Sequence, residues 1–135
     1  MALTKALRNS AIVIEKYVDL AATSGTTVGV AVPAGTLIVA AGFEPSEAVP
    51  NVTTYTMDIT DGTTTFADDL NFDNTAAGTI LVGTTAGLVA AADTVDVVTT
   101  ISGTPGIISG RVFVVAVDVN ESRLQADEVD RDTLA

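Results

Sequence analysis

Short runs of valine, isoleucine and threonine, separated by turn residues, dominate this chain of 135 residues. The runs recur roughly every 8 to 15 residues, with glycine, proline, aspartate or asparagine between them. β-Branched side chains fit the pleated surface of a sheet, and such spacing is typical of a sandwich or a barrel. We therefore predict an all-β fold: an antiparallel β-sandwich of about eight short strands, with a jelly roll as one candidate connection order.

The segment 53–60 shows the strand pattern most clearly. Tyr55, Met57 and Ile59 fall on one side of an extended chain, whereas threonines and Asp58 fall on the other. This alternation predicts a half-buried strand. By the same criteria, further strands are predicted at residues 11–20, 26–32, 37–43, 79–83, 94–102 and 110–120.

Two groups of turn residues predict hairpins. Pro33-Ala34-Gly35 separates segment 26–32 from segment 37–43, and Gly103-Thr104-Pro105-Gly106 separates segment 94–102 from segment 110–120. Glycine and proline supply the backbone angles that a tight reversal requires. We therefore expect the two strands of each pair to be neighbours in one sheet.

The length allows one domain, because single domains commonly have about 100 to 150 residues. We predict a sandwich domain at residues 11–120, preceded by an extended N-terminal arm at 1–10 and followed by an acidic tail at 121–135. The arm places leucines at helical spacing beside a small basic cluster. Its predicted contact residues are Leu3, Lys5, Leu7 and Arg8.

Charge excludes some partners. From Tyr17 to Gly110 the chain has ten carboxylates and no lysine, arginine or histidine, and the net charge is −11. Nucleic-acid binding depends on basic side chains that displace phosphate counterions, so no nucleic-acid partner is expected. Apolar runs are all shorter than about 18 residues, so no membrane partner is expected either.

The chain has no histidine, cysteine or tryptophan, which removes the usual imidazole base, thiol nucleophile and zinc ligands. Carboxylate pairs such as Asp58 with Asp61, or Asp68 with Asp69, could serve a glycosidase only within an aromatic-lined cleft. The chain has four Phe and two Tyr. We therefore predict no enzyme and no cofactor, and interpret these aspartates as turn caps and solvating groups.

Calcium is the remaining chemical candidate. Asp69, Asn71 and Asp73 place oxygen atoms at alternate positions, as at the start of an EF-hand loop. However, Asn74 stands at the turn glycine and Ile80 at the bidentate glutamate of that loop. A loose calcium site and an ordinary turn both remain open, and the predicted ligands would be Asp68, Asp69, Asn71 and Asp73.

The segment 110–120 is apolar on both sides, since one side carries Phe113, Val115 and Val117 and the other carries more valine and alanine. Only one side of a strand meets the core of a two-sheet sandwich. The other must be covered by a terminal segment or another subunit, so we expect a homodimer or a homotrimer. The residues assigned to these contacts are Val112, Val114 and Ala116.

Several motifs, taken in order, resemble the small β-sandwich virion proteins of tailed bacteriophages. They are a "PAGTL" strand, a "DxxDG" turn before an "FADG"-like stretch, an "ADT" strand start and a final Gly-Arg-Val strand. Asp69 replaces the glycine of "FADG". The resemblance covers roughly residues 15 to 120, with the motifs at 32–39, 57–62, 66–68, 92–97 and 110–114.

The resemblance implies a structural virion protein, first of all a capsid decoration or cement protein that binds the outer capsid surface by non-covalent contacts. Its partners would then be the major capsid protein and further copies of itself, and its location the virion. No catalytic residue is carried over. A head-fibre, tail or receptor- or glycan-binding β module is the alternative.

Overall fold

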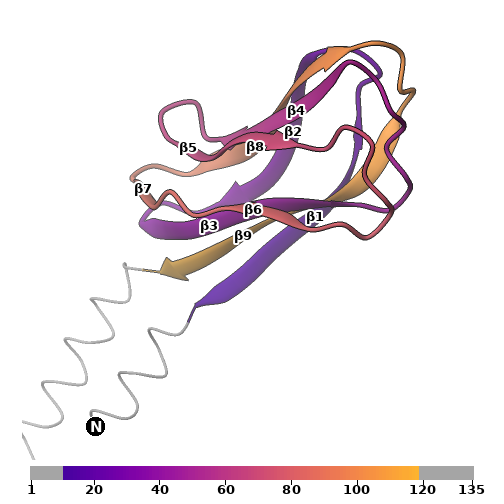
Figure 1. Cartoon of the computed structure of the whole chain (residues 1–135). Coiled ribbons are helices and arrows are strands. Elements are labelled where there is room, and N and C mark those ends of the chain that lie inside the picture. Colours follow the sequence, from indigo (N-terminus) through magenta and orange to yellow (C-terminus); the bar gives the residue numbers. More distant parts are fainter. Residues whose placement is uncertain (1–10, 119–135) are drawn as a thin grey trace, which may run out of the picture.

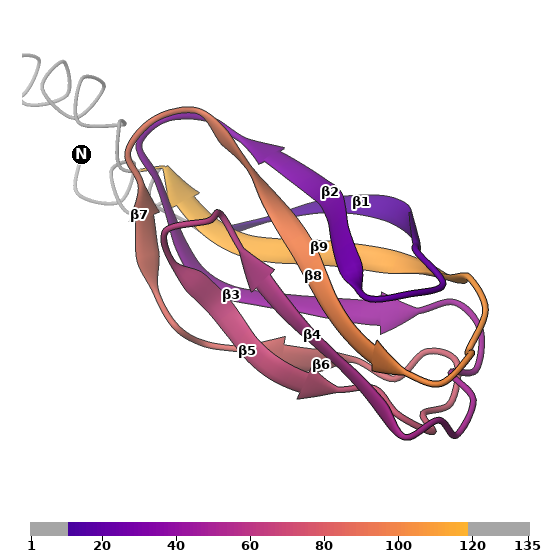
Figure 2. The ribbon, with the colours of Figure 1, turned by 90° about the horizontal axis from the view of Figure 1, so that it is seen from above.

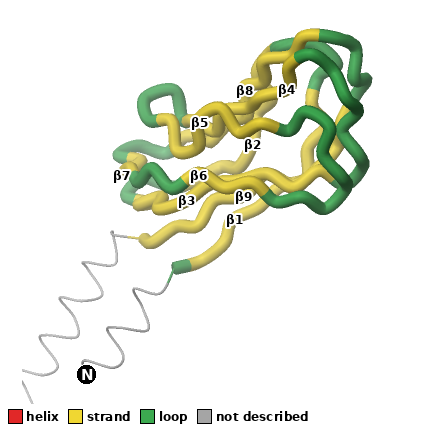
Figure 3. Tube along the Cα trace, in the orientation of Figure 1, coloured by secondary structure: helices red, strands yellow, loops and turns green. Residues whose placement is uncertain are grey.

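The computed structural model describes residues 11–118, which form nine strands and no helix. The strands make two antiparallel sheets that lie face to face (Figures 1 and 3). The all-β sandwich is therefore confirmed. The strands are β1 (Ile12–Leu20), β2 (Gly25–Val32), β3 (Thr36–Pro45), β4 (Thr54–Thr60), β5 (Thr65–Asn71), β6 (Leu81–Gly83), β7 (Gly87–Val89), β8 (Asp93–Ser102) and β9 (Ile108–Asp118).

The larger sheet has the order β1-β9-β3-β6, and β7 also pairs with β3. The smaller sheet has the order β2-β8-β4-β5. Figure 2 shows the two layers from above, with β8 crossing over the strands of the larger sheet. The last strand, β9, lies between β1 and β3, so the two ends of the described chain belong to the same sheet.

Both predicted hairpins are wrong. β2 pairs with β8 and β3 pairs with β9, so neither β2 and β3 nor β8 and β9 are neighbours. In each case the turn carries the chain to the facing sheet. Turn residues determine where the backbone reverses, but a reversal can lead either to the adjacent strand or across the roughly 10 Å between two packed sheets.

The core lies between the sheets and is made mostly of valine, isoleucine and phenylalanine. The alternation predicted for β4 is confirmed, because Tyr55, Met57 and Ile59 are buried and the residues between them are partly exposed. Phe43 and Phe72 meet edge to face, with ring centroids 5.6 Å apart. Such aromatic pairs add to the hydrophobic stabilisation of the core.

Two bulges change which residues face the core. The register of β2 with β8 shifts between Thr27 and Val30, so Val30 is buried whereas Val28 is 56% exposed. In β3 the register with β9 shifts between Ile38 and Ala40, and Ile38 is buried. A bulge adds one residue to one strand and so reverses the alternation beyond it, which strict period-2 counting does not anticipate.

The predicted strands all occur within the described range, but β5 and β7 were not predicted. β5 contains two adjacent aspartates and two register shifts, and β7 has only three residues. Within residues 11–118 the structure contains no helix of the length and hydrophobicity needed to cross a bilayer. The predicted arm at 1–10 and tail at 121–135 lie outside the described residues.

Candidate functional site

The two sheets present chemically different outer faces. On the smaller sheet, outward residues of β4 and β8 lie opposite one another in the pairs Thr56 with Thr100, Asp58 with Val98 and Thr60 with Asp96. We call this side the threonine face. Hydroxyls and carboxylates dominate it, so it is readily hydrated.

The outer side of the larger sheet, which we call the apolar face, is different. Residues directly opposite one another in a ladder share a side of the sheet. Val115 lies opposite both Val13 and Ala40, and Leu37 lies opposite both Val117 and Leu88. Several of these side chains are well exposed, among them Val13 at 58% and Leu88 at 52%. The outward residues of this face are Val13, Glu15, Tyr17, Asp19, Leu37, Ala40, Gly42, Glu44, Val82, Leu88, Ser109, Arg111, Phe113, Val115 and Val117.

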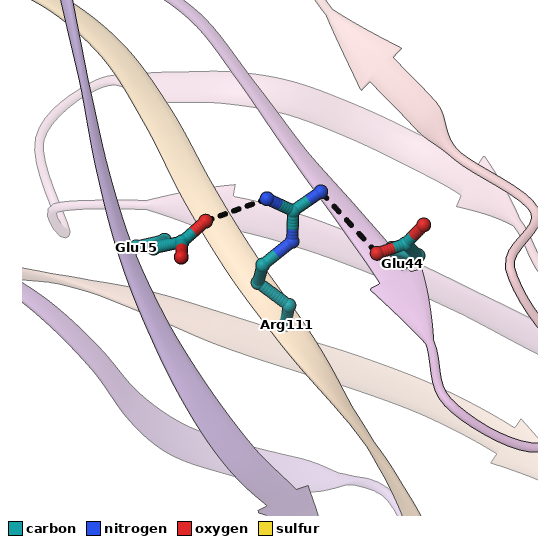
Figure 4. A network of polar contacts seen from close by, with 3 residues as sticks. All are labelled: Glu15, Glu44 and Arg111. Carbon is teal, nitrogen blue, oxygen red and sulfur yellow. Dashed lines mark hydrogen bonds and ion pairs between the residues drawn. The ribbon is translucent and has the colours of Figure 1, made fainter.

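Arg111, Glu15 and Glu44 form a triad on the apolar face (Figure 4). Asp19 is a further carboxylate on this side, at the end of the sheet, and accepts a hydrogen bond from the Ser109 hydroxyl at 2.6 Å. Arg111 Nη1 lies 2.5 Å from Glu15 Oε2, and Arg111 Nη2 lies 3.2 Å from Glu44 Oε1. The hydrogen bond to Glu15 is the main cause that raises the pKa of Arg111 above its ordinary value. The triad joins β1, β9 and β3 across their ladders, because its members lie on three adjacent strands.

Phe113 forms the centre of the apolar face. The guanidinium carbon of Arg111 lies 5.2 Å from the ring centroid, a cation–π distance. On β3 the residue opposite is Gly42, where a Cβ would come within 2.6 Å of the Phe113 ring. The missing side chain therefore leaves room for the ring, and Phe113 is only 8% exposed.

The contact role predicted for Val112, Val114 and Ala116 is wrong. All three are buried inside the sandwich by the chain's own side chains. The other side of the same strand, with Phe113, Val115 and Val117, faces outward. Periodicity showed that β9 has two apolar sides, but it could not show which one faces the second sheet. The other predicted contact residues, Leu3, Lys5, Leu7 and Arg8, lie outside the described residues.

The apolar-face residues on β1, β3 and β7 are not predicted by the sequence pattern. They come from segments far apart in the chain, and none stands out from a generally apolar composition. The one usable signal was the second apolar side of β9, because ladder partners on the same side complete the face.

The proposed calcium ligands divide into two groups. The carboxylates of Asp68 and Asp69 lie with that of Asp58, with one oxygen of each within 4.8 Å of the others. Asn71 Oδ1 instead accepts a hydrogen bond from the Asp73 backbone, and Asp73 Oδ1 accepts one from Val52 N–H at 2.6 Å. Asp73 therefore stabilises a loop, and the carboxylate that joins Asp68 and Asp69 is Asp58.

Repulsion within this acidic group raises the pKa of Asp68, mainly through Asp69 and then through Asp58. Asp69 N–H donates to Asp58 Oδ1 at 2.7 Å, and Asp69 has a φ of 52°. Asp and Asn tolerate this left-handed conformation better than most residues. The departure from the "FADG" motif is thus accommodated, because Asp69 adopts the backbone conformation that glycine would favour.

A pocket of about 250 Å³ lies at one end of the sandwich, between Asp61, Thr63, Asp93 and the stretch 88–91. Its carboxylates are already engaged. Asp61 Oδ1 accepts hydrogen bonds from the backbone N–H groups of Thr63 and Thr64, and Asp93 Oδ1 accepts one from Thr94 N–H. For Asp61 this is the turn-capping role predicted from the sequence.

Comparison with known proteins finds solved structures with a similar fold. No family model matches the chain, and no curated protein matches it. Among solved structures, a chain in the cyanophage Pam1 capsid asymmetric unit is similar, with a TM-score of 0.64 and 17% identity over 79% of this chain and 84% of that one. A chain in the capsid of the Helicobacter pylori bacteriophage KHP30 has a TM-score of 0.49 and 13% identity, over 80% of this chain and 91% of that one.

At these identities the likeness to the Pam1 chain shows a shared fold. The protein is thus a two-sheet antiparallel sandwich of a kind that also occurs in a phage capsid structure. Its two outer faces differ in polarity, and the apolar one is the candidate interaction site.

Proposed function

We propose that this protein is a structural component of a phage virion, and specifically a decoration or cement protein that binds the outer capsid surface. The observation that carries the proposal is a sandwich fold shared with a chain of a phage capsid structure, in a molecule with one hydrated and one apolar outer face. A decoration protein acts through buried interface area, repeated many times over a shell, and needs no reactive group.

Strand order supports this proposal. We interpret it as a jelly roll, by counting β6 and β7 as one interrupted strand because both pair with β3. Renumbered in this way, the two sheets read 1-8-3-6 and 2-7-4-5. Two sheets wound from two Greek keys in this manner are common in viral capsid domains.

The N-terminal residues Leu3, Lys5, Leu7 and Arg8 are the proposed contact with the major capsid protein. Residues 1–10 have a net charge of +2, whereas the whole chain has −11. A basic, partly apolar segment on an acidic protein can bind an acidic capsid surface while the threonine face stays in solvent.

The test uses shells of the parent phage that lack this protein. The full chain is expected to co-sediment with them and to raise the temperature at which they rupture. Lys5→Glu combined with Arg8→Glu should weaken co-sedimentation, because both changes reverse the charge of the proposed contact.

The matched control is Arg123→Glu combined with Arg131→Glu, which changes the net charge by the same amount in the other terminal segment and should bind as the wild type does. Failure of the wild-type chain to bind shells would refute the decoration role. Adsorption to host envelopes in the same preparation would point to the receptor- or glycan-binding alternative.

A further inference from the structure

The apolar face has the size and composition of an interaction surface. β1, β9 and β3 have 9, 11 and 10 residues. At about 3.3 Å per residue and about 4.8 Å between strands, the four-strand width gives a face of roughly 600 Å². Only the half that holds Val13, Leu37 and Leu88 is apolar, about 300 Å², which is within the range of the largest apolar patch on a typical monomer, and such patches are often functional. A contact that buries only the apolar half of each face would bury about 600 Å² over two copies, the size of a weak and transient interface.

We infer that the apolar face binds the apolar face of a second copy of this chain, which gives a two-fold symmetric dimer packed sheet against sheet. This inference is independent of the proposed function, since it concerns the isolated protein.

The distribution of charge on the face favours a second copy. The apolar residues Val13, Leu37 and Leu88 lie toward the end of the sheet where β1 begins. Arg111 and Glu44 lie toward its other end, and Glu15 lies between, two residues from Val13 on β1. A two-fold axis through the apolar half would match apolar side chains with apolar side chains. It would also place the two triads at opposite rims of the interface, where they stay hydrated.

The distribution of charge over the whole molecule favours the same arrangement. The group of Asp58, Asp68 and Asp69 belongs to the smaller sheet, as does Asp96. In a dimer joined through the larger sheets, these carboxylates lie on the two far sides of the assembly. Charges that are separated by more than a Debye length of about 8 Å repel one another little at physiological salt. The carboxylates of the smaller sheet therefore do not oppose this contact.

A terminal segment of the same chain is a less suitable occupant. Residues 1–10 join β1 at the apolar end of the face, so they would have to reverse direction to lie on it. As a helix they would span only about 15 Å, half of the length of the face. Residues 119–135 follow Asp118 at the same end of the sheet, so they too would have to reverse direction to lie on the face.

The experiment is sedimentation equilibrium of the full chain from about 1 to 100 µM, a range that spans the affinities expected for a contact of this size. We expect a mass that rises to twice the 13.7 kDa of one chain. Val13→Glu should raise the dimer dissociation constant by at least about tenfold, because a two-fold dimer would bury the new charge twice. Leu88→Glu, at the other edge of the face, should act in the same direction.

The matched control is Val28→Glu. Val28 lies on an edge strand of the smaller sheet and is 56% exposed, against 58% for Val13. It should change the dissociation constant by less than about twofold, as surface substitutions outside an interface usually do. Far-UV circular dichroism shows whether each variant is folded, and Val13→Thr replaces Val13→Glu if that variant is not.

Three results would overturn the inference. One is a wild-type chain that stays monomeric at the highest concentration, as it would if a terminal segment covered the face. Another is a stable mass of three chains. The third is a dimer that Val13→Glu and Leu88→Glu weaken no more than Val28→Glu does.

Discussion

At the residue scale, Asp68 is the aspartate whose pKa is raised by neighbouring carboxylates. Asp69 and Asp58 raise its pKa, so the folded protein binds this proton more tightly than the unfolded chain does. The resulting stability is present below the ordinary aspartate pKa, about 4, and is lost as the pH rises through the raised value. We expect Asp68→Asn to raise the melting temperature at pH 7 and to have no such effect below about pH 4. Asp93→Asn, an exposed aspartate outside the group, makes the same change in net charge and should leave the melting temperature nearly unchanged.

The second residue-scale prediction concerns Tyr55. Its side chain is fully buried, and within the described residues its hydroxyl has no hydrogen-bond partner. Burial, with a smaller contribution from Glu47, raises the pKa of Tyr55 from 10.0 to about 12. The folded state therefore loses stability as the pH rises through this range, because unfolding lets the tyrosine ionise.

We expect Tyr55→Phe to leave the free energy of unfolding at pH 7 unchanged or to increase it by up to about 1 kcal/mol, because it removes an unsatisfied hydroxyl. The variant should also resist unfolding better above pH 10. Urea titrations at pH 7 and at high pH measure both effects. Tyr17→Phe, at a position 71% exposed, is the control and should change neither the stability at pH 7 nor the resistance to unfolding above pH 10. A strong loss of stability at pH 7 in Tyr55→Phe would mean that the hydroxyl has a partner.

At the element scale, the triad holds together the strands that carry the apolar face. Arg111→Met keeps much of the side-chain volume but leaves Glu15 and Glu44 without their shared cation and Phe113 without its cover. We expect a lower melting temperature, which moves closer to that of the wild type in about 1 M NaCl, where the Debye length is about 3 Å. Lys16→Met is the control, because the Lys16 side chain is exposed and forms no ion pair within residues 11–118. An equal loss in both variants would show that net charge, and not the triad, is responsible.

Also at the element scale, the bulges in β2 and β3 explain why Val28 is exposed and Ile38 is buried. Each bulge depends on how two strands that are distant in the sequence pair. In the β2 bulge, for example, the backbone N–H of Gly29 donates a hydrogen bond to Asp96 Oδ1 on β8. A Cβ at Gly29 would lie 2.1 Å from the Val95 carbonyl oxygen, so this bulge requires glycine. The requirement is plain once the partner strand is known, and the sequence alone does not name that partner.

At the scale of the whole molecule, the last strand, β9, completes the larger sheet. β9 forms ladders with β1 and β3, so the larger sheet cannot form until nearly the whole described chain is available. We expect a chain ending at residue 107 to remain unfolded and a chain ending at residue 118 to fold, as measured by far-UV circular dichroism and cooperative urea unfolding. Pairing between such distant segments also predicts slow refolding, in about milliseconds to seconds. Cooperative unfolding of the shorter chain would contradict this account.

The sequence by itself determined the all-β class, the positions of most strands and the buried side of β4, because side-chain alternation and turn residues are local properties of the chain. It also determined the absence of imidazole and thiol chemistry. Only the tertiary structure decided that β2 and β3 lie in different sheets, that Val112 and Val114 face the core, and that Asp58 joins Asp68 and Asp69. These outcomes depend on which distant strands pair and which side of each meets the other sheet. That choice is made by packing of the whole core, which no short stretch of residues encodes.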